Sequence, residues 1–181
     1  VTLVRDVVVG DRCIFHSGCV VGADGFGNAM TPEGWVKVPQ VGGVRIGSDV
    51  EIGSCTSVDC GAIDDTVIGD GVRLDNQIQI GHNVIIGEHT AMASGCAIAG
   101  SAVIGKRCMF AGMVGMAGHI EVGDDVIVNG KGMISKNITQ PGAYASNFPI
   151  EPVRDWNRNV ALVRRLSKLS ERVARLEKKG K

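Results

Sequence analysis

The sequence predicts an all-β protein built as a parallel β-helix, followed by an α-helical extension. The main observation is an apolar residue at every sixth position from Ile68 to Ile134, twelve times in succession. A period of six fits neither an α-helix nor an alternating strand; it is the hexapeptide repeat, in which three hexads close one triangular coil. Composition agrees, because 26 glycines and only 4% aromatic residues suit aliphatic strands and tight corners. After Pro152 the apolar spacing becomes helical.

The β-helix is expected to span residues 1–142. The six-residue register already holds from Leu3 to Val21, and it ends after Ile134 in a proline-containing exit. Because the sequence begins inside this register and without Met, we expect further residues to precede it in the full protein. Known hexapeptide β-helices wind left-handed, an exception to the usual right-handed crossover, so this likeness implies a left-handed parallel β-helix here.

One long segment interrupts the register, from residue 22 to residue 45. It contains GADGFG, a Pro-Glu-Gly turn that begins at Pro32, and Trp35. Glycine-punctuated insertions leave a β-helix at a corner as external loops, which carry function more often than wall strands do. If Phe26 and Trp35 are exposed in this loop, a ligand or a neighbouring subunit would explain them. A plain solvent loop is the alternative.

A shorter slip of the register, between Val58 and Ile68, indicates one widened corner. Asp59, Asp64 and Asp65 lie in or beside it. Paired aspartates can serve acid–base chemistry or bind a metal, but turn hydrogen bonds explain aspartate in tight loops at least as often. We therefore interpret these three residues as structural.

The C-terminal part is expected to consist of a linker at 143–152 and a helix or helical hairpin over 153–181. Residues 143–181 carry ten Lys or Arg against four Asp or Glu, whereas residues 1–142 carry nine against fifteen. This segregated charge is either a solvated face or a field that attracts an acidic partner. The helical apolar spacing has two seams. They are Val153, Trp156, Val160 and Val163, then Leu162, Leu166, Leu169, Val173 and Leu176.

Composition also sets bounds on location and partners. The net charge is zero, so the whole molecule shows no preference for nucleic acid. No run of about eighteen apolar residues and no signal peptide is found, so we expect a cytoplasmic protein without stable membrane insertion. The six cysteines form no CxxC motif. Those at inward hexad places, which are Cys13, Cys19, Cys96 and Cys108, are expected to be buried thiols.

Of the four histidines, His82 is the strongest candidate for chemistry. It follows a polar run that includes Asp75 and Asn76. One coil is eighteen residues, so Gly100 should lie one rung above His82, about 4.8 Å away, and His119 about 10 Å away. An imidazole beside a backbone N–H suits acyl transfer, with a base for the nucleophile's proton and a donor for the oxyanion. The alternative is that His82 is a structural histidine at a corner of the coil, whose ring hydrogen bonds only stabilise the fold.

A zinc site of the kind found in carbonic-anhydrase-like β-helices is a further alternative. His82 and His119 would supply two ligands, but Asp124 and Asp125 stand where a third histidine would be needed. A catalytic zinc normally has three protein ligands and one open position. We therefore predict no metal site.

Several motifs together resemble one acyltransferase family. They are GADGFG (22–27), WVKVPQVG (35–42), SVDCGAIDDTVIG (57–69), LDNQIQIGHNVIIG (74–87) and GMAGHIEV (115–122). Over essentially the whole chain, the sequence is similar to the UDP-3-O-(3-hydroxyacyl)glucosamine N-acyltransferases of lipid A biosynthesis. Members of that family also have a separate uridine-binding domain ahead of their coils, which this sequence does not include. Position 60 is Cys here, where the family is expected to have Arg.

The resemblance implies transfer of an (R)-3-hydroxyacyl group from acyl carrier protein to the 2-amine of UDP-3-O-acylglucosamine. It implies a homotrimer with a site at each subunit seam. The resemblance also implies that His82 is the general base and that Asp75 orients it. The Gly100 N–H would line the oxyanion hole, and His119 would be a second functional imidazole. No cofactor is expected, because the thioester arrives activated on the phosphopantetheine arm of the carrier protein.

We also predict substrate contacts and a docking surface. Phe26, Asn76 and Met133 are the predicted substrate-binding residues, with Met133 at the floor of an apolar groove for the acyl chain. Two alternatives stay open: a sugar O-acyltransferase or CoA-dependent acetyltransferase of the hexapeptide class, and a structural β-helix without chemistry. The residues predicted to dock acyl carrier protein are Arg158, Arg164, Arg165, Lys168 and Arg172.

Overall fold

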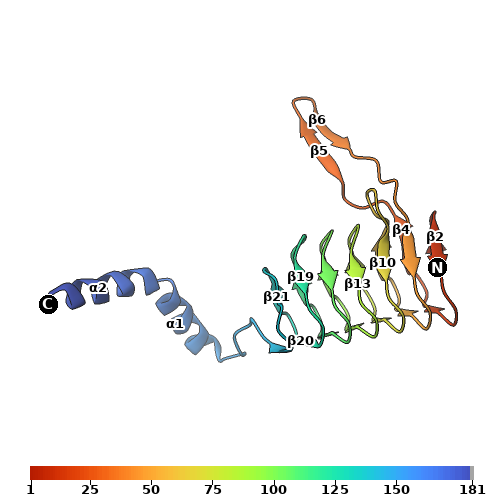
Figure 1. Ribbon diagram of the computed structural model, residues 1–181. Helices are drawn as coiled ribbons and strands as arrows, with labels where there is room; N and C mark the ends of the chain where they lie inside the picture. Colours follow the sequence, from red (N-terminus) through yellow and green to blue (C-terminus); the bar gives the residue numbers. More distant parts are fainter. Residues whose placement is uncertain (180–181) are drawn as a thin grey trace. The chain divides into compact units, whose positions relative to one another are not determined.

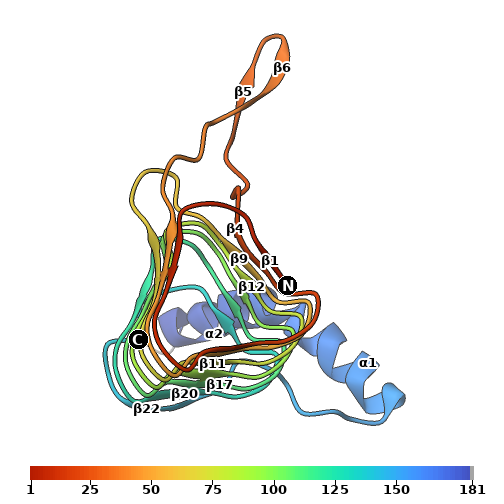
Figure 2. The same cartoon turned by 90° about the vertical axis from the view of Figure 1, so that its right-hand side faces the viewer.

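The computed structural model describes residues 1–179 and divides the chain into two compact units. The first unit, Val1–Asn147, is a parallel β-helix of stacked rungs, and the second begins at Phe148 and is helical. Viewed along its axis, the β-helix has a triangular outline with one sheet on each side (Figure 2). The predicted β-helix and helical extension are both present (Figure 1).

Each side of the triangle is one parallel sheet, which we name after a strand near its middle. The β12 face consists of β1 (Thr2–Leu3), β4 (Val20–Ala23), β9 (Ser57–Asp59), β12 (Gln79–Ile80), β15 (Ala97–Ile98), β18 (Gly115–Met116) and β21 (Met133–Ile134). The β13 face consists of β2 (Val7–Val9), β7 (Val44–Ile46), β10 (Thr66–Ile68), β13 (Ile85–Ile86), β16 (Val103–Ile104) and β19 (Glu121–Val122). The β11 face consists of β3 (Ile14–Phe15), β8 (Glu51–Ile52), β11 (Arg73–Leu74), β14 (Ala91–Met92), β17 (Met109–Phe110), β20 (Val126–Val128) and β22 (Gly142–Tyr144).

The repeating apolar residues fill the interior of the β-helix. Ile80 pairs with Ile98 and Ile98 with Met116, one coil of eighteen residues at each step, and all three side chains are buried. Backbone hydrogen bonds join the rungs; for example, the Gly81 N–H donates to Ile98 O at 2.9 Å. Cys19, Cys96 and Cys108 are buried free thiols, as predicted, whereas Cys13 is half-buried.

Two longer coils bear out the register breaks in the sequence. Ser57 pairs with Gln79, a separation of 22 residues instead of eighteen, so the corner at residues 61–65 is wider than the others by four residues. Val20 pairs with Ser57, and the extra residues between them include an antiparallel hairpin of β5 (Asn28–Thr31) and β6 (Gly34–Lys37), which projects from the β-helix in Figure 1. The predicted external loop is therefore present.

The helical unit contains α1 (Val153–Val163) and α2 (Leu166–Lys179). After the break at residues 164–165, α2 continues onward from α1 rather than folding back along it, so the arrangement is not a hairpin (Figure 1). Phe148 and Trp156 pack edge to face with ring centroids 6.3 Å apart. The strand β22 ends at Tyr144, so its last two residues fall within the segment expected to be a linker.

Candidate functional site

A cleft of about 660 Å³ opens around His82, between the β12 face and the base of the projecting loop. Figure 2 shows this loop leaving the triangle at one corner. We call this hollow the His82 cleft. Its lining residues are Asp24, Gly25, Phe26, Gly27, Asn28, Lys37, Asp59, Gln79, Gly81, His82, Ile98, Ala99 and Gly100.

Two glycines let the backbone approach the imidazole of His82. A Cβ atom on Gly100 would lie 2.5 Å from His82 Nε2, and one on Gly25 would lie 2.8 Å from His82 Cβ. Neither position can therefore carry a side chain without displacing the ring. The His82 O accepts the Ser101 N–H at 2.8 Å, which holds the corner of the next rung against this one. The predicted juxtaposition of His82 and Gly100 is present.

The loop end of the cleft is held by an ion-pair network. Arg5 donates to Asp24 at 3.0 Å and also to the backbone oxygen of Gln40, and Lys37 pairs with the other oxygen of Asp24. These cations, Lys37 above all, hold the pKa of Asp24 below its ordinary value. The network ties both ends of the loop to the first rungs, so Phe26 is carried to the edge of the cleft, where its side chain is 90% exposed.

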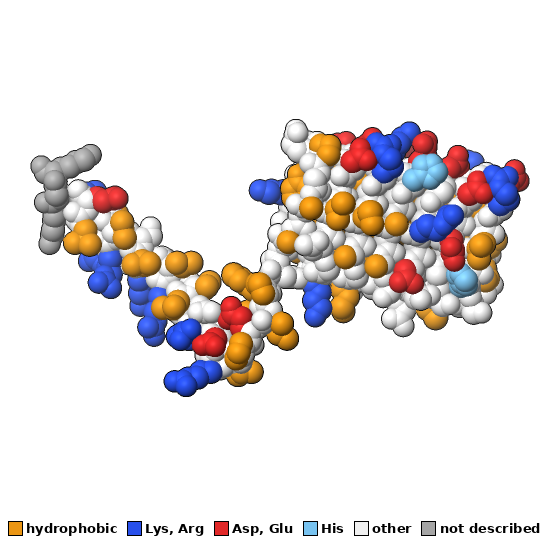
Figure 3. Space-filling model, turned by 90° about the horizontal axis from the view of Figure 1, so that it is seen from below, with side chains coloured by type: hydrophobic (Ala, Val, Ile, Leu, Met, Phe, Trp, Pro, Cys, Tyr) orange, Lys and Arg blue, Asp and Glu red, His pale blue; other side chains and the backbone are white. Residues whose placement is uncertain are grey.

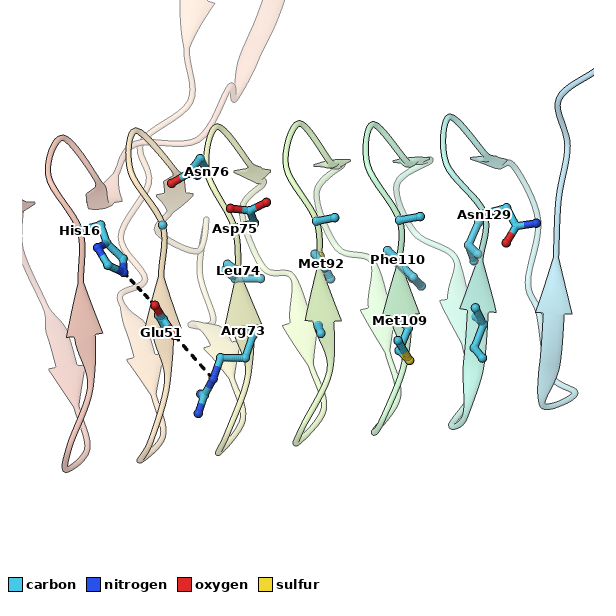
Figure 4. A pocket seen from close by; sticks show the side chains of 16 residues that line it. His16, Glu51, Arg73, Leu74, Asp75, Asn76, Met92, Met109, Phe110 and Asn129 are labelled. Atoms are coloured by element: carbon cyan, nitrogen blue, oxygen red, sulfur yellow. Dashed lines mark hydrogen bonds and ion pairs between the residues drawn. The ribbon is translucent and has the colours of Figure 1, made fainter. Parts of the chain in front are cut away.

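A second hollow, of about 610 Å³, lies on the β11 face (Figure 4). His16, Glu51 and Arg73 form a chain across one end of it, with His16 Nε2 2.8 Å from Glu51 Oε1 and Arg73 Nε 3.8 Å from Glu51 Oε2. Met109 and Ile127 supply exposed apolar surface farther along. Figure 3 looks onto this face and shows apolar side chains gathered across its middle.

Comparison with known proteins identifies relatives of this arrangement. Residues 65–100 match the model of the bacterial transferase hexapeptide family (six repeats). UDP-3-O-acylglucosamine N-acyltransferase from Bordetella pertussis is 48% identical over 98% of this chain and 50% of that protein. The enzymes of the same name from Hahella chejuensis and Coxiella burnetii are 49% and 50% identical, over 100% and 98% of this chain and 52% of each relative.

This chain is a homologue of the UDP-3-O-acylglucosamine N-acyltransferases. It spans about half the length of these curated relatives. Two solved UDP-N-acetylglucosamine acyltransferases share its fold. The enzyme from Moraxella catarrhalis has a TM-score of 0.69 and 19% identity over 79% of this chain and 54% of that one. The enzyme from Bacteroides fragilis has a TM-score of 0.68 and 21% identity over 81% and 55%. These neighbours are left-handed β-helices, which confirms the predicted fold class.

The structure does not bring all of the residues expected for an N-acyltransferase together within one chain. Asp75 follows β11 and His82 follows β12, so they stand at opposite ends of the β12 face. Asp75 Oδ2 accepts the Ser94 N–H at 3.0 Å, and Asp75 and Asn76 line the hollow on the β11 face instead of the His82 cleft (Figure 4). The ring of His82 contacts a different residue, with Nδ1 3.0 Å from Asn83 Oδ1.

His119 and Met133 lie farther along the stack. The His119 N–H donates to Gly100 O at 3.2 Å, and its exposed side chain is not part of the cleft wall. Met133 stands on the β12 face above Gly115 and Ala97, and its Sδ would lie 3.1 Å from a Cβ on Gly115. It is 57% exposed and borders a separate cavity of about 350 Å³ at the end of the β-helix.

Asp59 is a candidate that sequence reasoning set aside as a turn residue. It is half-buried in the wall of the His82 cleft, beside Gln79 and His82. Burial raises the pKa of its carboxyl, against the opposing influence of Gln79 and His82. The 22-residue register aligns Asp59 with Gly81, which has no side chain to cover it. The alignment of Asp59 with the residue that precedes His82 is the sequence signal that identifies Asp59 as a candidate.

The described residues contain neither a cluster suited to a metal ion nor a helix suited to a membrane. Within residues 1–179, no group of three or more His, Cys, Asp or Glu side chains is placed to hold a metal ion. Neither of the two described helices is long and apolar enough to cross a membrane. The five basic residues proposed for docking, Arg158, Arg164, Arg165, Lys168 and Arg172, are all exposed on α1, α2 and the break between them.

We predict that Asp59→Asn raises thermal stability at neutral pH. A carboxyl whose pKa is raised by folding costs free energy once it is ionised, and this cost grows as the pH rises through and above the ordinary carboxyl range. The neutral amide avoids the cost, so the melting temperature of the variant should exceed that of the native chain at pH 7. The gain should vanish at pH 3, where both side chains are neutral. Calorimetry at the two pH values measures it, and a gain of equal size at both would contradict the assignment.

Proposed function

We propose that this chain carries the acyl-transfer part of a cytoplasmic N-acyltransferase. It transfers an (R)-3-hydroxyacyl group from acyl carrier protein to the 2-amine of UDP-3-O-acylglucosamine, in lipid A biosynthesis. The observation that carries the proposal is the contact of the His82 ring with Gly100, in a chain 48–50% identical to UDP-3-O-acylglucosamine N-acyltransferases.

The chemistry follows from the positions of two groups in the cleft. The amine nitrogen attacks the thioester carbonyl while His82 Nε2 takes its proton, which is general base catalysis by an imidazole. The Gly100 N–H is proposed to donate to the oxyanion that forms on the carbonyl oxygen. When the tetrahedral intermediate collapses, the phosphopantetheine thiolate leaves and takes the proton back from His82. No cofactor is required, because the thioester is already activated.

A homotrimer would complete this site from two chains. Asp75 and Asn76 lie at a different corner from His82, so in a closed ring of three prisms the Asp75 corner of one chain would face the His82 corner of the next. The hollow on the β11 face presents Met109 and Ile127 as exposed apolar surface at that side, and such surface is expected to be covered. Asp75 then contributes a negative charge opposite the base.

The acyl chain is proposed to follow the β12 face from His82 toward Met133. Ala97 and Gly115 leave little side-chain bulk along this path, and three rungs of about 4.8 Å give roughly 14 Å, enough for about ten methylenes. Met133 would close the path, because a flexible thioether fills irregular gaps well. Phe26 is placed at the mouth of the cleft, where an exposed ring can contact the sugar nucleotide.

A sugar O-acyltransferase is the second candidate function. Two solved neighbours named as UDP-N-acetylglucosamine acyltransferases share the fold, but at 19% and 21% identity they support the architecture only. The product distinguishes the two functions. Mass spectrometry after incubation with acyl carrier protein thioester and either an amino or a hydroxyl sugar nucleotide should show an amide product from the amine. An ester product alone would overturn the proposal.

We expect His82→Ala to reduce turnover by about 10² to 10⁴-fold, the usual contribution of a general base. His119→Asn, which suits the left-handed φ of +59° at that corner, should cost much less because His119 stands outside the cleft wall. His89→Asn, with a similar φ of +58° but at the corner between the β13 and β11 faces, is the matched control and should keep full activity. Steady-state rates with a fixed acyl donor measure all three. If His82→Ala kept more than about a third of turnover, the mechanism would be wrong.

We expect mixed trimers to regain activity when Asp75 and His82 come from different chains. Co-expressed Asp75→Asn and His82→Ala chains form some seams in which an intact His82 faces an intact Asp75. Random mixing makes about a quarter of the seams complete, so activity should recover well above either parent. Absence of recovery in a verified mixed assembly would show that both residues act within one chain.

We expect Met133→Ala to shift donor preference toward longer acyl chains at a nearly unchanged total rate. Shortening the side chain opens the path toward the cavity of about 350 Å³ that Met133 borders. Competition between carrier-protein donors of graded length, read by mass spectrometry of the products, measures the shift. An unshifted chain-length profile would remove Met133 from the path.

We expect Arg164→Glu with Arg165→Glu to raise the KM for acylated carrier protein and to leave kcat nearly unchanged. The exposed basic side chains of residues 153–178 attract an acidic partner over about one Debye length, roughly 8 Å at physiological salt, so native binding should also weaken as salt rises. A short pantetheine thioester, which lacks the carrier, should be used equally well by both chains. Equal loss with both donors would contradict docking.

A further inference from the structure

We propose that Asn83 is the positioning residue that holds His82 with its ring proton on Nδ1, and that Asn83 does so within each chain in place of Asp75. The inference rests on the proposed function, because it assigns how the base of that reaction is prepared. It follows from a set of hydrogen bonds that joins the widened corner at residues 61–65 to the imidazole.

The backbone fixes the orientation of the Asn83 amide. Its Nδ2 donates to Asp64 O at 2.7 Å, and its Oδ1 accepts the Ala62 N–H at 2.9 Å. A backbone oxygen can only accept and a backbone N–H can only donate, so the amide cannot be turned over without losing both bonds. The Asn83 N–H is held as well, by Thr66 Oγ1 at 2.9 Å.

This orientation decides the tautomer of His82. The Asn83 Oδ1 lies 3.0 Å from His82 Nδ1, and an amide oxygen has lone pairs but no hydrogen. Nδ1 must therefore carry the proton, since a bare Nδ1 would place two lone pairs against each other. A neutral imidazole has one N–H, so Nε2 is left with its lone pair. Nε2 is the ring atom that a Cβ on Gly100 would meet at 2.5 Å, so the free lone pair lies beside the proposed oxyanion donor.

The widened corner at residues 61–65 therefore serves to orient the Asn83 amide. Its extra residues bring the Ala62 N–H and the Asp64 O to the two ends of the Asn83 amide. Gly61 lets them close, because a Cβ there would overlap Asp64 O and come within 2.9 Å of Asn83 Nδ2. Position 83 has a φ of +59°, which asparagine tolerates better than most residues do. Asp75 of the same chain cannot bond to His82 Nδ1, because Asn83 Oδ1 already occupies that position.

The test reads the tautomer directly. In the 181-residue chain labelled with ¹⁵N-histidine, which has four histidines, two-bond correlations from the ring protons report which nitrogen carries hydrogen. Asn83→Gly removes the amide at a left-handed position that glycine accepts without strain. Asn83→Asp keeps an oxygen acceptor and adds a charge. Asp75→Asn and Gln77→Gly, the latter at φ +56°, are the controls.

The native chain should show His82 protonated on Nδ1, and both controls should leave this unchanged. Asn83→Gly should populate the form protonated on Nε2 and lower kcat about tenfold, as expected for one lost hydrogen bond. Asn83→Asp should keep the proton on Nδ1 and move the acidic limb of the rate profile to higher pH. A carboxylate raises the pKa of a neighbouring imidazole, so a higher pH is then needed to free the base.

Three results would overturn the proposal. They are an Nε2 proton in the native chain, a tautomer unchanged by Asn83→Gly, and a tautomer changed by Asp75→Asn instead. If Asn83→Gly fails to fold, the native spectrum and Asn83→Asp still decide. A purely structural role would lower stability without moving the tautomer or the pH profile. Because the tautomer is read without turnover, failure of the proposed acyl transfer would show as an intact Nδ1 signal in a chain that forms no amide.

Discussion

The structure depends on the hydrogen-bonded register between successive coils. Each rung donates to and accepts from the next, as when the Ala99 N–H donates to Met116 O at 3.0 Å. A parallel ladder holds neighbouring strands about 4.8 Å apart, so residues one coil apart in sequence become neighbours in space. The proposed catalytic pair is a direct product of this constraint, because Gly100 follows His82 by one coil. A shift of one residue in either rung would separate them and turn core side chains outward.

The groups that surround the proposed base, His82, come from the coils that depart from this register. The long coil that carries β5 and β6 brings Gly25 and Phe26 to His82, and the coil widened at 61–65 supplies the backbone groups that fix Asn83. The strands on both sides of each departure still pair, with one register shift between Val21 and Ala23 where the long loop leaves β4. The regular coils thus act as a rigid support, and the irregular corners act as the parts that surround the reacting groups.

One residue of the His82 cleft, Asp59, lowers the stability of the fold. Asp59 is half-buried beside Gln79 and His82, and burial raises the pKa of its carboxyl. A charged group kept in such a place costs free energy in folding, which is typical of residues retained for binding or catalysis. Burial of the apolar core, which includes Ile80 and Ile98, stabilises the fold and offsets this free-energy cost. Asp75 and His82 are separated because they lie at two different corners of the β-helix, and one triangular prism cannot bring two of its own corners together.

The sequence by itself determined the coil, the two register breaks, the helical end and the stacking of Gly100 on His82. All of these follow from a six-residue period, which sequence displays directly. Only the tertiary structure decided which polar groups meet. Asp75 and His82 are seven residues apart yet stand at different corners, whereas Asp59 lies beside His82 across a coil of 22 residues. The contact between Asn83 and His82 depends on how Ala62 and Asp64 orient one amide. Spacing gives the position of a residue in the coil, but the direction of a hydrogen bond depends on side-chain and loop geometry, which the period does not encode.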